Sequence, residues 1–201
     1  MQAADAAAAE SLADALADDA FYAFITAPLP PAQRRSAMVA YMAASLAEGR
    51  AAGRVVAEPL GAAIWTLPDD DDSSGAQAAA AAKHAALDVA LGAAGLARRA
   101  AVVDSMTRLC APLEQLRHAW YLSILGVAPA AQRGGVARRL LAPTLRECDE
   151  QRAAAWLETY GAETLPVYER FGFKVLGQPF VEPVRVATYY IMLRPPQPVA
   201  G

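Results

Sequence analysis

The stretch AWYLSILGVAPAAQRGGVAR, residues 119–138, decides the fold. Its first part, residues 119–127, is a near-continuous apolar run of strand length, rich in aromatic and branched side chains. Such a run is typical of a strand buried on both faces. Pro129 ends the strand, and Val136 begins a segment whose apolar residues recur at helical spacing. The stretch therefore predicts a central strand, a loop with two glycines, and a helix.

The loop carries the residue types that bind phosphate. Gly134 and Gly135 let the backbone turn sharply and approach a ligand closely. Free amides at a helix N-terminus, together with the helix dipole, favour a phosphate or pyrophosphate there. Arg133 and Arg138 add positive charge. The glycine pair alone favours an ordinary connection over a phosphate site, because it matches neither a P-loop nor a dinucleotide fingerprint.

Two motifs in a fixed order carry a resemblance to a known family. Gln132, Gly135 and Ala137 match a Gln/Arg-x-x-Gly-x-Gly/Ala motif, and Tyr168 stands shortly before the Gly172-Phe173 pair. In these motifs and in their spacing the sequence resembles the GNAT superfamily of acetyl-CoA-dependent N-acyltransferases. The resemblance is strong over residues 119–193, weaker over 3–65 and poor over 68–118.

The resemblance implies a fold and a cosubstrate. It implies one α/β (α+β) domain over residues 1–201, with an acetyl-CoA core at about 119–193. The mostly antiparallel central sheet is flanked by helices and splayed at Gly126 and Val127, between its two central strands. Acetyl-CoA is the implied cosubstrate, and no metal is required. Its pantetheine arm and pyrophosphate are expected on Leu125, Gly126, Val127, Gln132, Arg133, Gly134, Gly135, Val136, Ala137 and Arg138.

The same resemblance implies catalytic roles. Tyr168 would protonate the departing thiolate, although a purely structural role is the alternative because Leu165, Tyr168 and Phe171 share one helical face. Glu158 is the candidate base, with a surface carboxylate near an arginine as the alternative. An alkyl amine with a pKa of about 10.4 needs such a base, whereas an α-amino group needs little help.

Outside the central stretch, the chain predicts alternating helices and strands. Helices are expected over residues 3–20, 32–48, 76–117 and 164–171, with breaks near 92–95 and 112. Strands are expected over residues 54–57, 61–67, 153–159, 173–176 and 184–193. The aspartates 69–72 predict a solvated loop. The family's first strand is missing or very short, which should expose one sheet edge or leave it to a partner chain.

Composition excludes several classes of protein. The net charge is −3 without a basic cluster, which argues against a nucleic-acid partner. The longest uncharged stretch, residues 119–132, is too short to span a bilayer. Two cysteines and two histidines without ligand spacing predict reduced thiols and no metal site. We therefore expect a cytoplasmic protein, as a monomer or homodimer, that binds neither nucleic acid nor membrane.

The expected function is acetyl transfer from acetyl-CoA to a primary amine of a small molecule, by direct attack on the thioester. Phe21, Tyr22 and Trp65 are the candidate residues that line the acceptor pocket. Two alternatives remain open at this stage. The acceptor amine could belong to a protein N-terminus or lysine, or the chain could be a non-catalytic domain that binds acyl-CoA.

Overall fold

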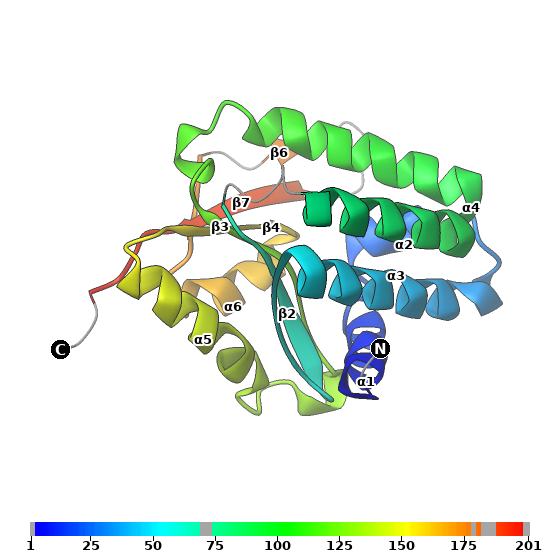
Figure 1. Ribbon diagram of the computed structural model, residues 1–201, viewed down its shortest axis with the longest axis horizontal. Helices are drawn as coiled ribbons and strands as arrows, with labels where there is room; N and C mark the ends of the chain where they lie inside the picture. The colour runs from blue at the N-terminus through cyan, green and yellow to red at the C-terminus, as the bar shows by residue number, and fades with distance from the viewer. Residues whose placement is uncertain (1–2, 69–73, 178–179, 182–187, 199–201) are drawn as a thin grey trace.

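The sheet is built outward from β3, Trp120–Val127 (Figure 1). The computed structural model describes residues 3–68, 74–177, 180–181 and 188–198. The other strands are β1 (Gly53–Glu58), β2 (Gly61–Thr66), β4 (Ala155–Tyr160), β5 (Lys174–Val175), β6 (Phe180–Val181) and β7 (Thr188–Arg194). The helices are α1 (Ala3–Ala15), α2 (Ala20–Thr26), α3 (Pro31–Ala52), α4 (Ser74–Cys110), α5 (Val136–Glu150) and α6 (Leu165–Glu169). Short 3₁₀ helices are η1 (Glu114–Leu116), η2 (Pro129–Ala131) and η3 (Ala162–Thr164).

The strands lie in the order β1-β2-β3-β4-β7-β5, with β6 beside β7. Strands β3 and β4 run parallel, and the other neighbours within the described residues are antiparallel. The predicted mostly antiparallel sheet is therefore confirmed. The ladder between β3 and β4 consists of the pairs Trp120–Ala155, Tyr121–Trp156 and Leu122–Leu157. The central strands diverge beyond these pairs, so the splay begins earlier than the predicted position at Gly126 and Val127.

Helices cover both faces of the sheet (Figure 1). Because side chains alternate along a strand, β2 sends Ile64 into a core shared with α1, α3 and α4. It sends Trp65 into a second core, which includes Leu140 and Leu141 of α5. The two cores place α5 on one face and the N-terminal helices on the other.

The predicted first helix is confirmed, but it ends at Ala15 and not at residue 20, and a separate helix that was not predicted follows it. Helix α1 ends at Ala15 and α2 begins at Ala20. Asp19 is the N-cap of α2, and its Oδ1 accepts hydrogen bonds from Phe21 N at 2.9 Å and Tyr22 N at 3.3 Å. The cap has extended backbone angles and stops the alanine-rich run from continuing as one helix.

The predicted break in the long fourth helix is confirmed at Gly92, whose φ of 63° and ψ of 174° are not helical. Glycine adopts this conformation without the clash that a side chain would introduce. Beyond the kink, a Cβ on Gly95 would lie 2.7 Å from the carbonyl oxygen of Ile25. Helices α4 and α2 therefore approach closely and hold the second half of α4 over the sheet.

The edge of the sheet next to β2 is formed by β1. In the described part of the chain, α1 is the first element. The predicted loop of aspartates at 69–72 lies outside the described residues, as do residues 184–187 of the last predicted strand.

Candidate functional site

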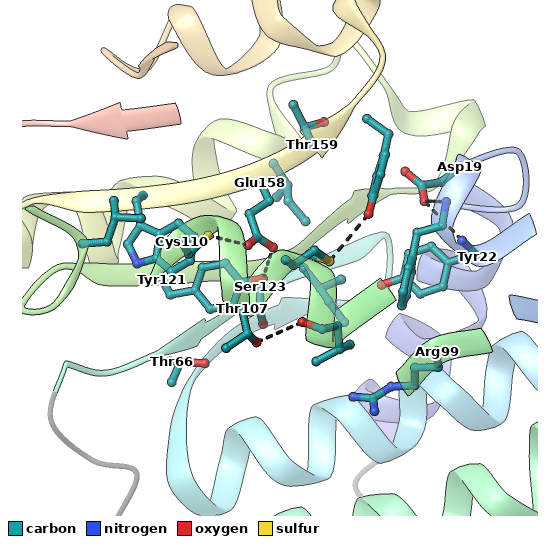
Figure 2. Close-up of a pocket in the computed structure, with 18 of the residues that line it drawn as sticks. Asp19, Tyr22, Thr66, Arg99, Thr107, Cys110, Tyr121, Ser123, Glu158 and Thr159 are labelled. Carbon is teal, nitrogen blue, oxygen red and sulfur yellow. Dashed lines mark hydrogen bonds between the residues drawn. The ribbon is translucent and has the colours of Figure 1, made fainter. Parts of the chain in front are cut away.

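A cavity of about 800 Å³ lies on the face of the sheet that carries the N-terminal helices. Its walls come from α2, α3, α4, α6 and the central strands β3 and β4. Figure 2 shows polar side chains from several of these elements turned toward one space. Among the predicted site residues, those that line it are Phe21, Tyr22, Leu125, Glu158 and Tyr168.

The divergence of β3 and β4 opens the sheet beside this cavity. On the other side of β3, the register with β2 shifts, so that Ile64 pairs with Ile124 and Trp65 with Leu122. Ser123 is thus the extra residue of a β-bulge, and its hydroxyl donates to Ile64 O at 3.1 Å. A bulge bends its strand and increases the local twist. It turns Leu125, Gly126 and Val127 away from β4.

The loop after β3 contains two residues with left-handed backbone angles. Arg133 and Gly135 have positive φ values, 64° and 79°, and Gly135 is the N-cap of α5 without a side-chain cap. A Cβ on Gly135 would meet nothing within 4 Å. Gln132 stabilises the turn, because its Nε2 donates to Val127 O at 3.3 Å. The first amides of α5 have no acceptor within the helix.

The loop side chains differ in exposure. Gln132, Arg133, Gly134, Gly135 and Arg138 are exposed at the helix start. Val136 and Ala137 instead pack against the core under α5. The predicted cosubstrate residues thus lie along one stretch of chain from the end of β3 to the first turn of α5, and Gly126, Val127 and Val136 among them are buried.

Glu158 accepts hydrogen bonds from side chains of two other elements (Figure 2). The Tyr121 hydroxyl donates to its Oε2 at 2.8 Å, and the Cys110 thiol donates to its Oε1 at 3.4 Å. Cys110 also lies 3.7 Å from the Tyr189 hydroxyl. This geometry places Glu158 within the cavity wall and not at an exposed surface beside Arg152 or Arg170.

The groups around Glu158 are held in their protonated forms. Burial, reinforced by the Glu158 carboxylate, raises the pKa of Tyr121 well above its usual value. The same two causes raise the pKa of Cys110 to about 12 and raise that of Tyr189. A phenol or thiol with a raised pKa keeps its proton at neutral pH and remains a hydrogen-bond donor. Glu158 is therefore the acceptor that these donors orient.

Tyr168 lines the cavity from α6, beneath the divergence of the central strands. Burial, and to a lesser extent the Asp19 carboxylate, raises its pKa to about 12, so its hydroxyl carries a proton at neutral pH. Its ring meets Phe173 edge to face, with centroids 6.3 Å apart. The side chain therefore has both a core contact and access to the cavity.

Aromatic rings form the wall opposite the sheet. Tyr22 packs edge to face against Phe21 and Tyr41, with centroids 5.0 Å and 5.3 Å apart. Trp65, in contrast, does not line the large cavity. It is fully buried in the core beneath α5, because the alternation along β2 turns Ile64 toward the N-terminal helices and Trp65 away from them.

Sequence reasoning missed several polar residues of the cavity. Asp19, Arg99, Cys110 and Tyr121 all line it. Asp19 is the N-cap of α2, and burial raises its pKa. Little in the sequence indicated these residues. Asp19, Arg99 and Cys110 lie outside the segment of strong resemblance, and Tyr121 is part of an apolar run that predicts only a buried strand.

Within the described residues, no three His, Cys, Asp or Glu side chains gather closely enough to hold a metal ion. Among the described helices, none has the length and apolar character needed to cross a membrane.

Comparison with known proteins identifies related sequences. The family model described as an acetyltransferase (GNAT) domain matches residues 88–191. An uncharacterized N-acetyltransferase, C550.08, from Schizosaccharomyces pombe is 38% identical over 56 residues. That alignment covers 28% of this chain and 23% of the yeast protein, so the chain spans less than a quarter of the relative's length.

Solved structures share the fold over nearly the whole chain. A structure from Corynebacterium glutamicum ATCC 13032, described as histone acetyltransferase HPA2 and related acetyltransferase, has a TM-score of 0.69 and 20% identity. It covers 100% of this chain and 96% of its own. PH1933 from Pyrococcus horikoshii OT3 has a TM-score of 0.53 and 14% identity, covering 98% of this chain and 96% of its own. At these identities the structural similarity shows the fold alone.

Proposed function

The chain belongs to the GNAT acetyltransferase family, and from this we propose that it transfers the acetyl group of acetyl-CoA to a primary amine of a small molecule. The single observation that carries this proposal is the cavity at the splayed strands, which brings Glu158 and Tyr168 to one space. We further propose that residues 1–201 act as one domain, in the cytoplasm, as a monomer or homodimer.

The residues after β3 fit acetyl-CoA as cosubstrate. The uncapped first turn of α5 and the open space at Gly135 suit the pyrophosphate, with Arg133 and Arg138 adding positive charge. The backbone from Leu125 to Val127 would pair with the pantetheine arm, because β4 has diverged from this part of β3. The thioester would then lie at the bulge, beside the cavity.

The acceptor amine would approach from the cavity. Its neutral nitrogen attacks the thioester carbonyl carbon, the C–S bond breaks, and an amide and coenzyme A result. Glu158 would take the proton that the amine loses, directly or through water, since an alkyl amine with a pKa of about 10.4 arrives as an ammonium ion. Tyr168 would give its proton to the departing thiolate, whose parent thiol has a pKa of about 8.5.

The size and walls of the cavity favour a small acceptor. Small-molecule pockets typically enclose roughly 300–1,000 Å³, and about 800 Å³ lies within this range. The rings of Phe21, Tyr22 and Tyr41 pack edge to face along the cavity wall, and we infer that this aromatic wall favours a compact acceptor. The segments at residues 65–68, 157–159 and 168–170 resemble those of puromycin N-acetyltransferase, a family member with a small-molecule acceptor, and this resemblance supports the proposal.

The test is release of coenzyme A from acetyl-CoA, measured with a thiol reagent across a panel of primary amines and peptides. We expect turnover with a small amine and none with a peptide N-terminus or lysine. Glu158→Gln should reduce kcat/KM for an alkyl amine by about a hundredfold at pH 7. The loss should shrink as the pH rises toward the pKa of the amine, and Glu150→Gln, on the exposed part of α5, is the control.

Other outcomes have a definite meaning. Turnover confined to peptides would assign the chain to protein acetylation. Tight acetyl-CoA binding without turnover of any amine would make it a non-catalytic binding domain. Either result would reject the small-molecule acceptor.

A further inference from the structure

Arg99 differs from the other cations that line the cavity. Lys83 binds Glu48 at 2.6 Å, and Arg117 binds Glu114 at 2.8 Å, so a carboxylate compensates each of them. Arg99 donates its Nε–H to the Tyr41 hydroxyl at 3.3 Å. Within the described residues, no carboxylate lies at salt-bridge distance from it. A guanidinium has five N–H donors, and a neutral hydroxyl occupies one of them here.

The fold keeps Arg99 at the cavity. Gly95, one turn earlier on α4, packs against the Ile25 carbonyl of α2 and fixes this part of the helix. The neighbouring Arg98 serves a structural purpose, because its Nη1 donates to Phe24 O at 3.0 Å and its guanidinium lies 4.8 Å from the Phe24 ring centroid. Arg99 is half-buried, and the contacts of Gly95 and Arg98 fix the part of α4 that carries it. Its own guanidinium makes no comparable contact with α2, all of which lies within the described residues.

Arg99 lies apart from the groups assigned to the chemistry. It precedes Cys110, which contacts Glu158, by 11 positions on α4. At a rise of 1.5 Å per residue, the two Cα atoms are about 16 Å apart. Figure 2 places Arg99 and Glu158 on different sides of the cavity, with Tyr22 also on its wall. An acceptor whose amine lies near Glu158 would extend toward Arg99.

We propose that Arg99 is an anion-binding subsite and that the acceptor carries an acidic group, such as a carboxylate, remote from its reactive amine. This builds on the acetyl transfer proposed above and narrows its substrate class. A carboxylate would pair with two N–H groups of the guanidinium in the planar arrangement that arginine favours. The site is half-buried beside the rings of Tyr22 and Tyr41, so water and salt would screen such an ion pair less there than at an exposed position.

The experiment uses amines in matched pairs that differ only in charge. The acids are ω-amino acids from glycine to 6-aminohexanoate and 4-(aminomethyl)benzoate, each measured beside its own carboxamide. We expect at least one acid to exceed its carboxamide in kcat/KM by about tenfold to a hundredfold, the usual worth of a charge-assisted hydrogen-bonded pair. The preferred chain length then reports the span between the amine and the acidic group.

Substitutions of Arg99 test whether this residue causes the preference for the acid. Arg99→Gln should remove the preference for the acid and leave turnover of the carboxamide within about twofold, while Arg99→Lys should retain part of it. The control is Arg108→Gln, whose exposed side chain pairs with Asp104 on the outer surface of α4. Thermal unfolding of each variant checks that it is folded.

Two results would overturn the subsite. One is a wild-type enzyme that turns over no acid faster than its carboxamide. The other is an acid preference that survives Arg99→Gln. If no amine at all is acetylated, the proposed reaction fails separately. Calorimetric titration of the protein with 4-(aminomethyl)benzoate in the presence of coenzyme A then decides the subsite alone, and binding that Arg99→Gln does not weaken rejects it.

Discussion

At the scale of single residues, the site has a carboxylate, Glu158, that accepts hydrogen bonds, and neighbouring hydroxyl and thiol groups that donate them. Glu158 accepts from Tyr121 and Cys110, while Tyr168 stands apart from this cluster on α6. This separation is compatible with the opposite tasks proposed for the two residues. The donors around Glu158 favour its ionised form, which has room for a proton, and the raised pKa of Tyr168 keeps a proton on its hydroxyl at neutral pH.

Tyr168→Phe tests the proton delivery. We expect kcat to fall by about a hundredfold, the lower end for a general acid, because the thiolate of coenzyme A leaves readily. The KM for acetyl-CoA should change little, since the ring remains packed on Phe173. Steady-state kinetics measure both values. Tyr190→Phe is the control, because Tyr190 is not among the residues that line the cavity. An unchanged kcat for Tyr168→Phe would reduce Tyr168 to a core residue.

Residues of the site were predicted unequally well from the sequence. Glu158 and Tyr168 could be named because each stands beside a recognisable local pattern. Trp65 was placed in the acceptor pocket, yet its position on β2 sends it to the opposite core. Arg99 was not named at all. Its place in the cavity depends on the kink at Gly92, which was predicted, and on the close packing of Gly95 against the Ile25 carbonyl, which no local sequence pattern indicates.

At the scale of elements, the strand, loop and helix over residues 119–138 were predictable because their signals are local. A long apolar run, a proline and two glycines determine where β3 ends and α5 begins. The break between α1 and α2 was missed for the converse reason. Alanine favours helix throughout residues 3–20, and only the capping bonds of Asp19 reveal the interruption.

The loop before α5 makes its own prediction. Gly135→Glu should weaken acetyl-CoA binding by at least about a hundredfold, because a carboxylate would stand in the space proposed for the pyrophosphate. Gly135→Gln is the matched control, since it has nearly the same size and the same cost at a φ of 79° but no charge. It should weaken binding less and lower stability equally. Titration calorimetry with acetyl-CoA compares the two, and equal affinities for both variants and the wild type would place the pyrophosphate elsewhere.

At the scale of the whole molecule, one face of the sheet carries the cavity and the other carries the most buried ion pair of the described residues. The face with the N-terminal helices holds the cavity, and on the other face the end of β7 is bonded to α5 and to the turn that follows α6. Arg194 is central to that second face. It donates two hydrogen bonds to Asp149, at 2.6 Å and 2.8 Å, and a third to Phe171 O at 2.8 Å. Asp149 also accepts from Gln197 N at 2.7 Å, which fastens the segment after β7.

This arrangement should dominate stability among the ion pairs of the described residues. The Arg194 and Asp149 side chains are only 6% and 15% exposed, whereas those of Arg108 and Asp104 are 64% and 65% exposed. Removing one partner of a buried pair leaves an uncompensated charge and costs about 3 kcal/mol, while an exposed pair contributes under about 1 kcal/mol. Asp149→Asn should therefore lower Tm by roughly 6 °C or more. Asp104→Asn should leave it nearly unchanged.

The contribution of Asp149 to the free energy of unfolding should also decrease at acidic pH. Its hydrogen bonds with Arg194 hold the pKa of the carboxyl below its usual value, so the native state binds this proton less readily than the unfolded state does. The stabilisation is then fully present above the unfolded pKa of about 3.9 and is lost as the pH falls through the lower native value. Urea unfolding at pH 3 to 8 measures the difference between wild type and Asp149→Asn. That difference should be constant above about pH 5 and shrink below pH 4, and a difference that grows on acidification would contradict the assignment.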